Sequence, residues 1–261
     1  MCRLFFPRHK LDLVVFPCPV GQRPVEYLQR IVGRRLVDAM IISATCKIDA
    51  RIEFLNKAGI PFIALGRSDS GENLRWIDLD FEGVASSAVD RLAARGHRRI
   101  AIGIPSDDIN FGHVYHEAYR SGLARHGIPY DPALVFRQDR AVEGGHGLAT
   151  QIVRTENPPT AILLATETAP SLYRGLVEYG VMPGKDIAII GFRDNPRSRY
   201  LTPSLTCHAF SLPELGKTVA ETLLADMPNF AKYYPDMATN KIWPVQLVQG
   251  DSDDFTLPAK T

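Results

Sequence analysis

The stretch DIAIIGFRDNPRSRYLTPSLT, from Asp186 to Thr206, decides the fold more than any other part of the chain. Its apolar residues Ile187 to Ile190 predict a buried strand that ends at Gly191 and leads straight into a polar loop. In open α/β folds such a loop lies at the carboxyl edge of a parallel sheet, where small ligands bind. The stretch therefore predicts an α/β fold with a candidate ligand-binding loop.

Strand and helix patterns alternate in the first third of the chain. Pro24 begins an amphipathic helix, and Asp49 is predicted to cap a second helix that ends at Gly59. The predicted strands between these helices are Leu11–Phe16, Val37–Ser43 and Phe62–Leu65. This order, with its short connections, predicts a parallel sheet with helices on both faces.

A short crossing strand, Trp76 to Asp80, leads into a second alternating series. The predicted elements are helix 81–94, strand 100–104, helix 111–126, strand 134–136, helix 143–154, strand 161–165, helix 170–179, strand 187–190, helix 213–224 and a last strand, 243–248. The polar tail from Gly250 is expected to be frayed. Two successive α/β series predict two lobes, with a ligand in the cleft between them.

Composition and charge place the chain among ordinary soluble proteins. The formal net charge of +1 argues against a dedicated nucleic-acid surface. No apolar run reaches the length of about 20 residues that a spanning helix needs, and no signal peptide is recognised. The four cysteines form no CxxC pair, which is typical of free thiols in a reducing cytoplasm; they are Cys2, Cys18, Cys46 and Cys207.

Several segments resemble, in the same order, the effector-binding domain of lac-repressor-type (LacI/GalR) transcriptional regulators. LAARGHRRIAI, from Leu92 to Ile102, is similar to the helix-to-strand junction of that family, and Ile187–Phe192 and Leu201–Thr206 resemble its "VAVIGF" and "LxPPLT" segments. Weaker similarities lie at Val37–Ile42, Ile60–Ile63, Pro159–Ile162 and Trp243–Val248. Their shared order makes the resemblance specific, and it covers about Leu11 to Ser252.

The resemblance implies a two-lobed, periplasmic-binding-protein-like fold in which each lobe is a parallel sheet flanked by helices. The expected lobes are 1–80 with 210–228 and 81–209 with 241–250, followed by a tail, 251–261. Compared with the family, the helix-turn-helix headpiece and the first strand and helix of the first lobe are missing. A missing inner strand leaves backbone groups unpaired, which is unfavourable. We expect either that Met1 to Lys10 covers the gap or that the chain is a fragment or a mis-started reading frame.

The resemblance also implies an effector-binding set. Tyr115 stands where a family Arg usually precedes the "AG" of the next helix. Thr166 and Glu167 replace a common "ND" pair, and Arg193 replaces the Asp of "GFD". The full set of expected effector-binding residues is Ser43, Arg67, Phe111, Tyr115, Arg140, Glu167, Arg193 and Asp194.

Three arginines in this set, Arg67, Arg140 and Arg193, suggest the chemistry of the effector. A guanidinium is a rigid fork that suits carboxylate or phosphate, so one hypothesis is a sugar-like effector with an anionic group. The alternative is that one or two of these arginines pair with Glu167 or Asp194 and that the sugar is neutral. Titration with matched neutral and acidic sugars distinguishes the two.

The sequence contains no pattern typical of an enzyme. GxGxxG, GxxxxGK[ST] and GxSxG are absent, so no cofactor is expected. His113 and His116 share a predicted helix face, but a metal site needs a third ligand, and no metal site is expected. Asp107 and Asp108 are interpreted as helix-capping residues rather than an acid–base pair.

The resulting hypothesis is the ligand-sensing core of a LacI-type regulator, cytoplasmic and homodimeric. A sugar-like effector binds between the lobes and changes their relative orientation, and operator DNA is bound only through a headpiece that this chain lacks. No membrane association is expected. The alternative is a periplasmic-type sugar-binding protein that serves a transporter, because the two classes share one fold.

Overall fold

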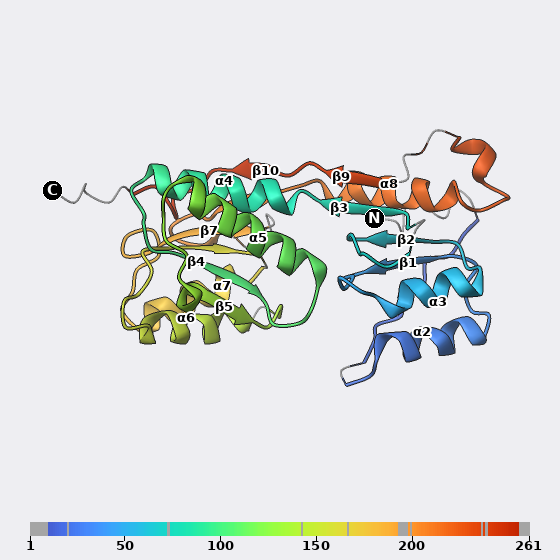
Figure 1. Cartoon of the computed structure of the whole chain (residues 1–261), viewed down its shortest axis with the longest axis horizontal. Helices are drawn as coiled ribbons and strands as arrows, with labels where there is room; N and C mark the ends of the chain where they lie inside the picture. The colour runs from blue at the N-terminus through green and yellow to red at the C-terminus, as the bar shows by residue number, and fades with distance from the viewer. Residues whose placement is uncertain are drawn as a thin grey trace. The chain divides into compact units, whose positions relative to one another are not determined.

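The computed structural model describes residues 10–19, 21–71, 74–141, 143–165, 167–192, 198, 200–235, 237 and 240–255. The chain divides into two compact units, Met1–Leu79 with Ser211–Trp243 and Asp80–Phe210 with Pro244–Thr261. Each unit has its own sheet flanked by helices (Figure 1), which confirms the predicted α/β class. In the described part of the chain, no helix is both long enough and apolar enough to cross a membrane.

The first unit is built on a parallel sheet with the strand order β1-β2-β3-β9. Its strands are Met40–Ser43 (β1), Phe62–Leu65 (β2), Trp76–Leu79 (β3) and Asn240–Trp243 (β9). Its helices are Pro24–Gly33 (α2), Ala50–Ala58 (α3), Leu212–Leu224 (α8) and the short 3-10 helix Ala231–Tyr233 (η4). The core of this unit packs α2 and α3 against β1 and β2 through buried side chains such as Leu28, Ile52 and Phe62.

The second unit has a larger sheet with the strand order β10-β8-β7-β6-β4-β5, parallel except for β10. Its strands are Ile100–Pro105 (β4), Val135–Gln138 (β5), Ala161–Leu164 (β6), Ala188–Phe192 (β7), Thr206–Ala209 (β8) and Gln246–Val248 (β10). Its helices are Phe81–Ala94 (α4), Asn110–Arg125 (α5), Gly144–Arg154 (α6), Ala169–Glu178 (α7) and the short Pro132–Leu134 (η2). Figure 1 shows α4 and α5 on one side of this sheet and α6 and α7 on the other.

Local chemistry sets the helix boundaries as the sequence predicts. Pro24 is the first residue of α2, where its missing N–H is not needed. The Asp49 carboxylate caps α3 by accepting from the Arg51 backbone N–H, and Gly59 ends that helix with a φ of 65°. These helix boundaries are therefore set by residues that lie close together in the sequence.

Two strand predictions are wrong. Among the described residues 10–19, no strand forms where Leu11–Phe16 was expected to be one. The strand expected over Trp243–Val248 is instead two strands in two different sheets: β9 pairs with β3, and β10 pairs with β8. Pro244 follows β9 directly and has no backbone N–H to give to a ladder, so the first pairing stops there.

The expectation of a frayed tail is wrong for Ser252 and Asp253, whose side chains are completely buried. The Ser252 hydroxyl donates to the Ile189 carbonyl oxygen at 2.6 Å. The Asp253 carboxylate accepts from the Thr206 hydroxyl at 2.6 Å and forms an ion pair with Arg91. These contacts join the end of the described chain to β7, β8 and α4, so it is part of the core of the second unit.

Candidate functional site

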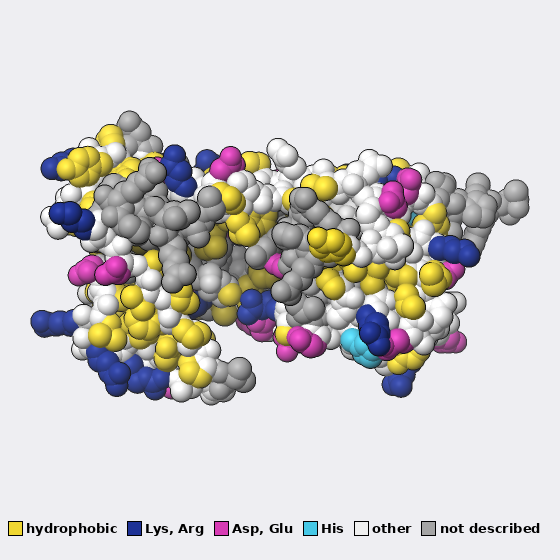
Figure 2. All heavy atoms as spheres, turned by 180° about the vertical axis from the view of Figure 1, so that it is seen from behind, with side chains coloured by type: hydrophobic (Ala, Val, Ile, Leu, Met, Phe, Trp, Pro, Cys, Tyr) yellow, Lys and Arg dark blue, Asp and Glu magenta, His cyan; other side chains and the backbone are white. Residues whose placement is uncertain are grey.

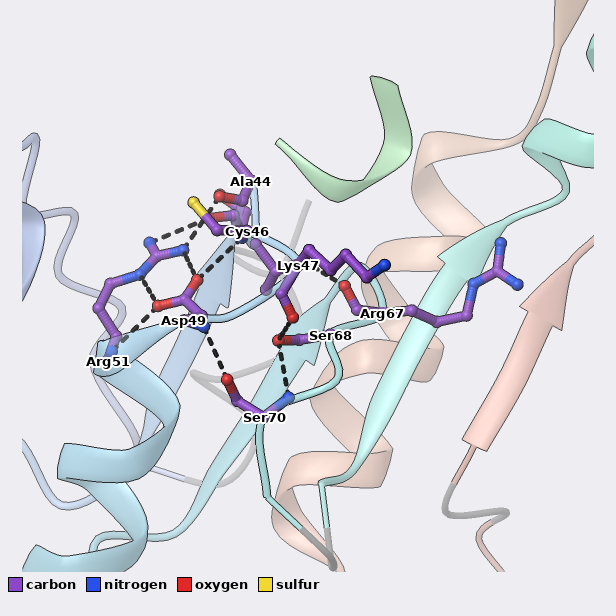
Figure 3. Close-up of polar contacts among 10 residues, drawn as sticks. Ala44, Cys46, Lys47, Asp49, Arg51, Arg67, Ser68 and Ser70 are labelled. Carbon is purple, nitrogen blue, oxygen red and sulfur yellow. Dashed lines mark hydrogen bonds and ion pairs between the residues drawn. The ribbon is translucent and has the colours of Figure 1, made fainter. Parts of the chain in front are cut away.

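In the first unit, polar groups gather at the carboxyl ends of β1 and β2, in the loops 44–49 and 66–71 (Figure 3). The carboxyl ends of neighbouring parallel strands lie at one edge of a sheet, where α/β folds bind ligands. Two predicted residues belong to this edge, Ser43 at the end of β1 and Arg67 after β2.

Asp49 and Arg51 hold the first of these loops. The Arg51 guanidinium donates to the Asp49 carboxylate at 2.6 and 3.0 Å and to the carbonyl oxygens of Ser43 and Ala44 at 3.1 and 3.0 Å. Burial acts to raise the pKa of Asp49, but the hydrogen bonds and positive charge of Arg51 outweigh it, and the pKa is lowered. Asp49 is therefore an ionised anchor for a loop in which Ala44 adopts a φ of 52°.

Side chains of each loop hydrogen-bond the backbone of the other. The Thr45 hydroxyl donates to the Arg67 carbonyl oxygen at 2.9 Å, and the Ser68 hydroxyl donates to the Lys47 carbonyl oxygen at 3.0 Å. The close approach requires a glycine after β2, because a Cβ on Gly66 would lie 2.5 Å from the Thr45 hydroxyl oxygen. The two loops thus form one scaffold.

Arg67 extends away from the Asp49 cluster (Figure 3) and pairs with a buried carboxylate. Its Nε lies 2.7 Å from Asp78 Oδ2, and its guanidinium lies over the Trp76 ring at 5.8 Å. Burial raises the pKa of Asp78, although Arg67 opposes the shift. Arg67 and Asp78 together offer donors and acceptors beside an aromatic ring, an arrangement that suits hydroxyl groups.

In the second unit, the candidate residues follow β4, β5 and β6. Phe111, at the start of α5, stacks on Phe81 with ring centroids 4.7 Å apart. Arg140, after β5, donates from Nε to Asp107 Oδ2 at 3.1 Å, and both side chains are about half exposed. Glu167 follows β6 and is partly buried.

Tyr115 differs from its prediction. The side chain is completely buried, and its hydroxyl donates to the Leu164 carbonyl oxygen at 3.2 Å. Burial raises the pKa of this phenol far above its ordinary value. Tyr115 therefore packs α5 onto β6, and we leave it out of the proposed site. Arg193 and Asp194 lie outside the described residues.

The convergence of three arginines stays a prediction, because Arg193 lies outside the described residues and Arg67 and Arg140 belong to different units. In the described residues, Arg67 has Asp78 as a carboxylate partner, and Arg140 has Asp107. Sequence reasoning missed both pairings and the role of Arg51. An Asp-x-Arg pattern at the start of α3, after the loop that follows β1, was the available signal for the Asp49–Arg51 pair.

The two histidines of α5 that were considered as metal ligands lie within hydrogen-bond distance of other side chains. His113 Nε2 lies 2.5 Å from Asp108 Oδ1, and His116 Nε2 lies 3.1 Å from the Tyr130 hydroxyl. Across the described ranges, no three His, Cys, Asp or Glu side chains are grouped as metal ligands.

Known proteins are similar to most of this chain. The model of the family described as periplasmic binding protein-like domain matches residues 89–252. The HTH-type transcriptional regulator AglR of Rhizobium meliloti is 28% identical over 225 residues, covering 84% of this chain and 62% of AglR. RafR of Escherichia coli, also an HTH-type regulator, is 36% identical over 161 residues, covering 59% of this chain and 45% of RafR.

A solved LacI-family transcriptional regulator from Enterococcus faecium, with bound ribose, is 25% identical to the chain. The similarity covers 98% of this chain and 92% of that one, with a TM-score of 0.81. The chain therefore belongs to the family of periplasmic binding protein-like domains. Within that family, it is an effector-binding domain of the LacI/GalR type, and its curated relatives are transcriptional regulators rather than enzymes. It spans about 62% of the length of AglR and 45% of the length of RafR.

Proposed function

We propose that this chain senses a sugar-like effector for a LacI-type transcriptional regulator. The observation that carries the proposal is the polar scaffold at the carboxyl ends of β1 and β2, which holds Ser43 and Arg67 in a domain whose solved relative binds ribose. The second unit is proposed to contribute Phe111, Arg140 and Glu167 at the ends of β4, β5 and β6. Arg193 and Asp194 stay in the proposed set on sequence grounds alone.

The proposed mechanism is a hinge. An effector that contacts both units favours one relative orientation of the two, and it shifts that equilibrium only by the difference between its affinities for the two orientations. The whole regulator is proposed to be a cytoplasmic homodimer that contacts operator DNA through a helix-turn-helix headpiece, as the names of its HTH-type relatives suggest.

The ion pairs of Arg67 and Arg140 favour a neutral sugar over an anionic one. Each guanidinium already faces a carboxylate, at 2.7 Å for Asp78 and 3.1 Å for Asp107, so its charge is partly neutralised. A carboxylate on the effector would approach Asp78 and Asp107 as a like charge, which is unfavourable. Neutral hydroxyl groups can use both the donors and the acceptors of these pairs.

Calorimetric titration of the full chain tests the proposal. Ribose, galactose and cellobiose are the neutral probes, and galacturonate is the acidic counterpart of galactose. Saturable binding of a neutral sugar, weakened about tenfold or more by Arg67→Ala, is expected, since Arg67 would lose charge-assisted hydrogen bonds to the ligand. Tighter binding of galacturonate than of galactose would mean that the effector is anionic rather than neutral. Turnover of any bound sugar would contradict the whole proposal.

A further inference from the structure

A carboxylate stands within an inner strand of the first unit. Asp78 lies in β3, and β3 pairs with β2 on one side and with β9 on the other. The Asp78 side chain is only 4% exposed. Burying a carboxylate costs free energy and aspartate is unfavourable in strands, so a well-packed apolar residue would serve the strand at least as well. The presence of Asp78 is therefore better explained by its partner than by packing.

The Asp78 carboxylate is held by two hydrogen bonds. Its Oδ2 accepts from Arg67 Nε at 2.7 Å, and its Oδ1 accepts from the Leu79 backbone N–H at 2.9 Å. Because the backbone of β3 is held by a strand on each side, the carboxylate has little freedom to move. Its negative charge is therefore fixed beside the guanidinium of Arg67.

Arg67 is held at both ends of its length. Its backbone carbonyl oxygen accepts from the Thr45 hydroxyl at 2.9 Å, and its guanidinium lies over the Trp76 ring at 5.8 Å. Between these contacts the side chain extends away from the Asp49 cluster (Figure 3). Because Nε is bonded to Asp78, the plane of the guanidinium is also set. Asp78 thus determines both the direction and the net charge of the group that Arg67 offers to a ligand.

The Arg140–Asp107 pair of the second unit is weaker by comparison. Its side chains are 45% and 46% exposed, whereas those of Arg67 and Asp78 are 25% and 4% exposed. Water screens an exposed ion pair much more than a buried one. Asp78 therefore neutralises its arginine more completely than Asp107 does.

The charge of the molecule as a whole does not select a ligand. The formal net charge is +1, and on the face that Figure 2 shows, both basic and acidic side chains occur on each unit. A surface of mixed sign produces no strong field toward ligands of one charge. Selection between neutral and anionic ligands is therefore a local property of the ion pairs at the site.

We propose that Asp78 is a specificity-determining residue of the effector site, which neutralises and orients Arg67 and thereby excludes sugars that carry a carboxylate. This inference rests on the proposed function, because it takes Arg67 as a contact of the effector. It has a direct consequence. Removing the charge of Asp78 while keeping an acceptor for Arg67 Nε should convert the site to a preference for sugar acids, because an unneutralised guanidinium suits a carboxylate.

Calorimetric titration of Asp78→Asn in the full chain tests the inference. The probes are two matched pairs, galactose with galacturonate and glucose with glucuronate, at about pH 8, where both acids are ionised. The quantity compared is the dissociation constant of each acid relative to that of its neutral partner. In Asp78→Asn this ratio should fall about tenfold or more, because a buried negative charge has been removed. A merely structural loss would weaken both sugars of a pair alike.

A second variant and a control complete the experiment. Asp78→Thr keeps a hydroxyl that can accept from Arg67 Nε, and its β-branched side chain suits a strand, so it should show the same shift even if Asp78→Asn fails to fold. The matched control is Glu26→Gln on α2, which changes the net charge by the same amount at a side chain that is 55% exposed. Its ratio should equal that of the unmodified chain.

Three results would overturn the inference while the proposed function stands. They are an unchanged ratio in both Asp78 variants, an absence of sugar-acid binding by both, and an equal shift in Glu26→Gln, which would assign the effect to net charge. Failure of the unmodified chain to bind any sugar, including ribose and cellobiose, is a different outcome. It would remove the proposed function, and this inference with it.

Discussion

Asp253 lies near the end of the sequence, yet its side chain is completely buried. Its buried carboxylate pairs with Arg91, whose side chain is only 17% exposed, and lies 3.7 Å from Arg95. Asp253→Ala should lower the free energy of unfolding by about 3 kcal/mol, because it leaves buried positive charge without a partner. Urea unfolding followed by circular dichroism measures the change.

The neighbouring Asp254 provides the control. Its side chain is 61% exposed and lies 3.8 Å from Arg95, so Asp254→Ala should change the free energy of unfolding by less than about 0.5 kcal/mol. If the two substitutions changed the free energy of unfolding equally, the buried Asp253 ion pair would contribute no more to stability than the exposed Asp254 contact.

Two buried histidines make stability depend on pH. Burial lowers the pKa of His97 to about 4, with Asp253 opposing and Arg95 reinforcing the shift, and burial also lowers the pKa of His208 to about 4. The unfolded chain therefore takes up protons below about pH 6.5 that the folded chain does not. The free energy of unfolding should fall as pH drops from about 6.5 to about 4, by roughly 1–3 kcal/mol for each histidine, and these contributions are constant below that range.

Substituting the two histidines distinguishes their contribution to the pH dependence of stability from that of other titrating groups. His208→Gln keeps a partner for the Ser87 hydroxyl, which lies 2.9 Å from His208 Nε2, but it cannot take up a proton. The slope of unfolding free energy against pH should be smaller in His208→Gln and smaller still when His97→Asn is added. An unchanged slope in the double variant would refute the assignment.

At the scale of elements, the connection from β1 to α3 is held by Arg51. Its side chain is 17% exposed and joins two carbonyl oxygens of the loop to Asp49, which is 4% exposed. Arg51→Ala should destabilise the first unit by about 2 kcal/mol, since it leaves the buried Asp49 carboxylate without its ion-pair partner. Amide hydrogen exchange in residues 44–49 should become faster than in α3.

An exposed arginine at the N-cap of α2 is the matched control. Arg23 pairs with Glu26, and their side chains are 76% and 55% exposed. Arg23→Ala should therefore cost less than about 0.5 kcal/mol and leave exchange in residues 44–49 unchanged. If Arg23→Ala and Arg51→Ala behave alike, the loop does not depend on the Arg51 contacts.

At the scale of the whole molecule, the proposed hinge makes a prediction about shape. Small-angle scattering of the full chain should give a different radius of gyration with and without a saturating sugar that binds in the calorimetric test. The change is expected because a ligand that contacts both units stabilises one of their orientations. If the sugar bound without changing the radius of gyration, the proposed hinge would be contradicted, whereas the proposed effector binding would stand.

Much of the fold follows from local sequence, whereas the candidate site does not. The caps Asp49 and Gly59 act on neighbours a few residues away, so their positions were predictable. The partner of Arg67 is Asp78, eleven positions along the chain and on another strand, and it depends on β2 pairing with β3. Tyr115 was predicted to face a ligand, but packing of α5 on the sheet of the second unit buries it.

The sequence by itself determined the alternation of strands and helices and the α/β class, because apolar periodicity and helix caps are local signals. It indicated the family through motifs that resemble that family's in the same order, such as Leu92–Ile102. Only the tertiary structure decided that Trp243 and Val248 belong to strands of different sheets and that Asp253 is a buried partner of Arg91. These contacts join residues far apart in the chain. Their formation depends on the geometry of the assembled sheets, which short-range sequence patterns do not encode.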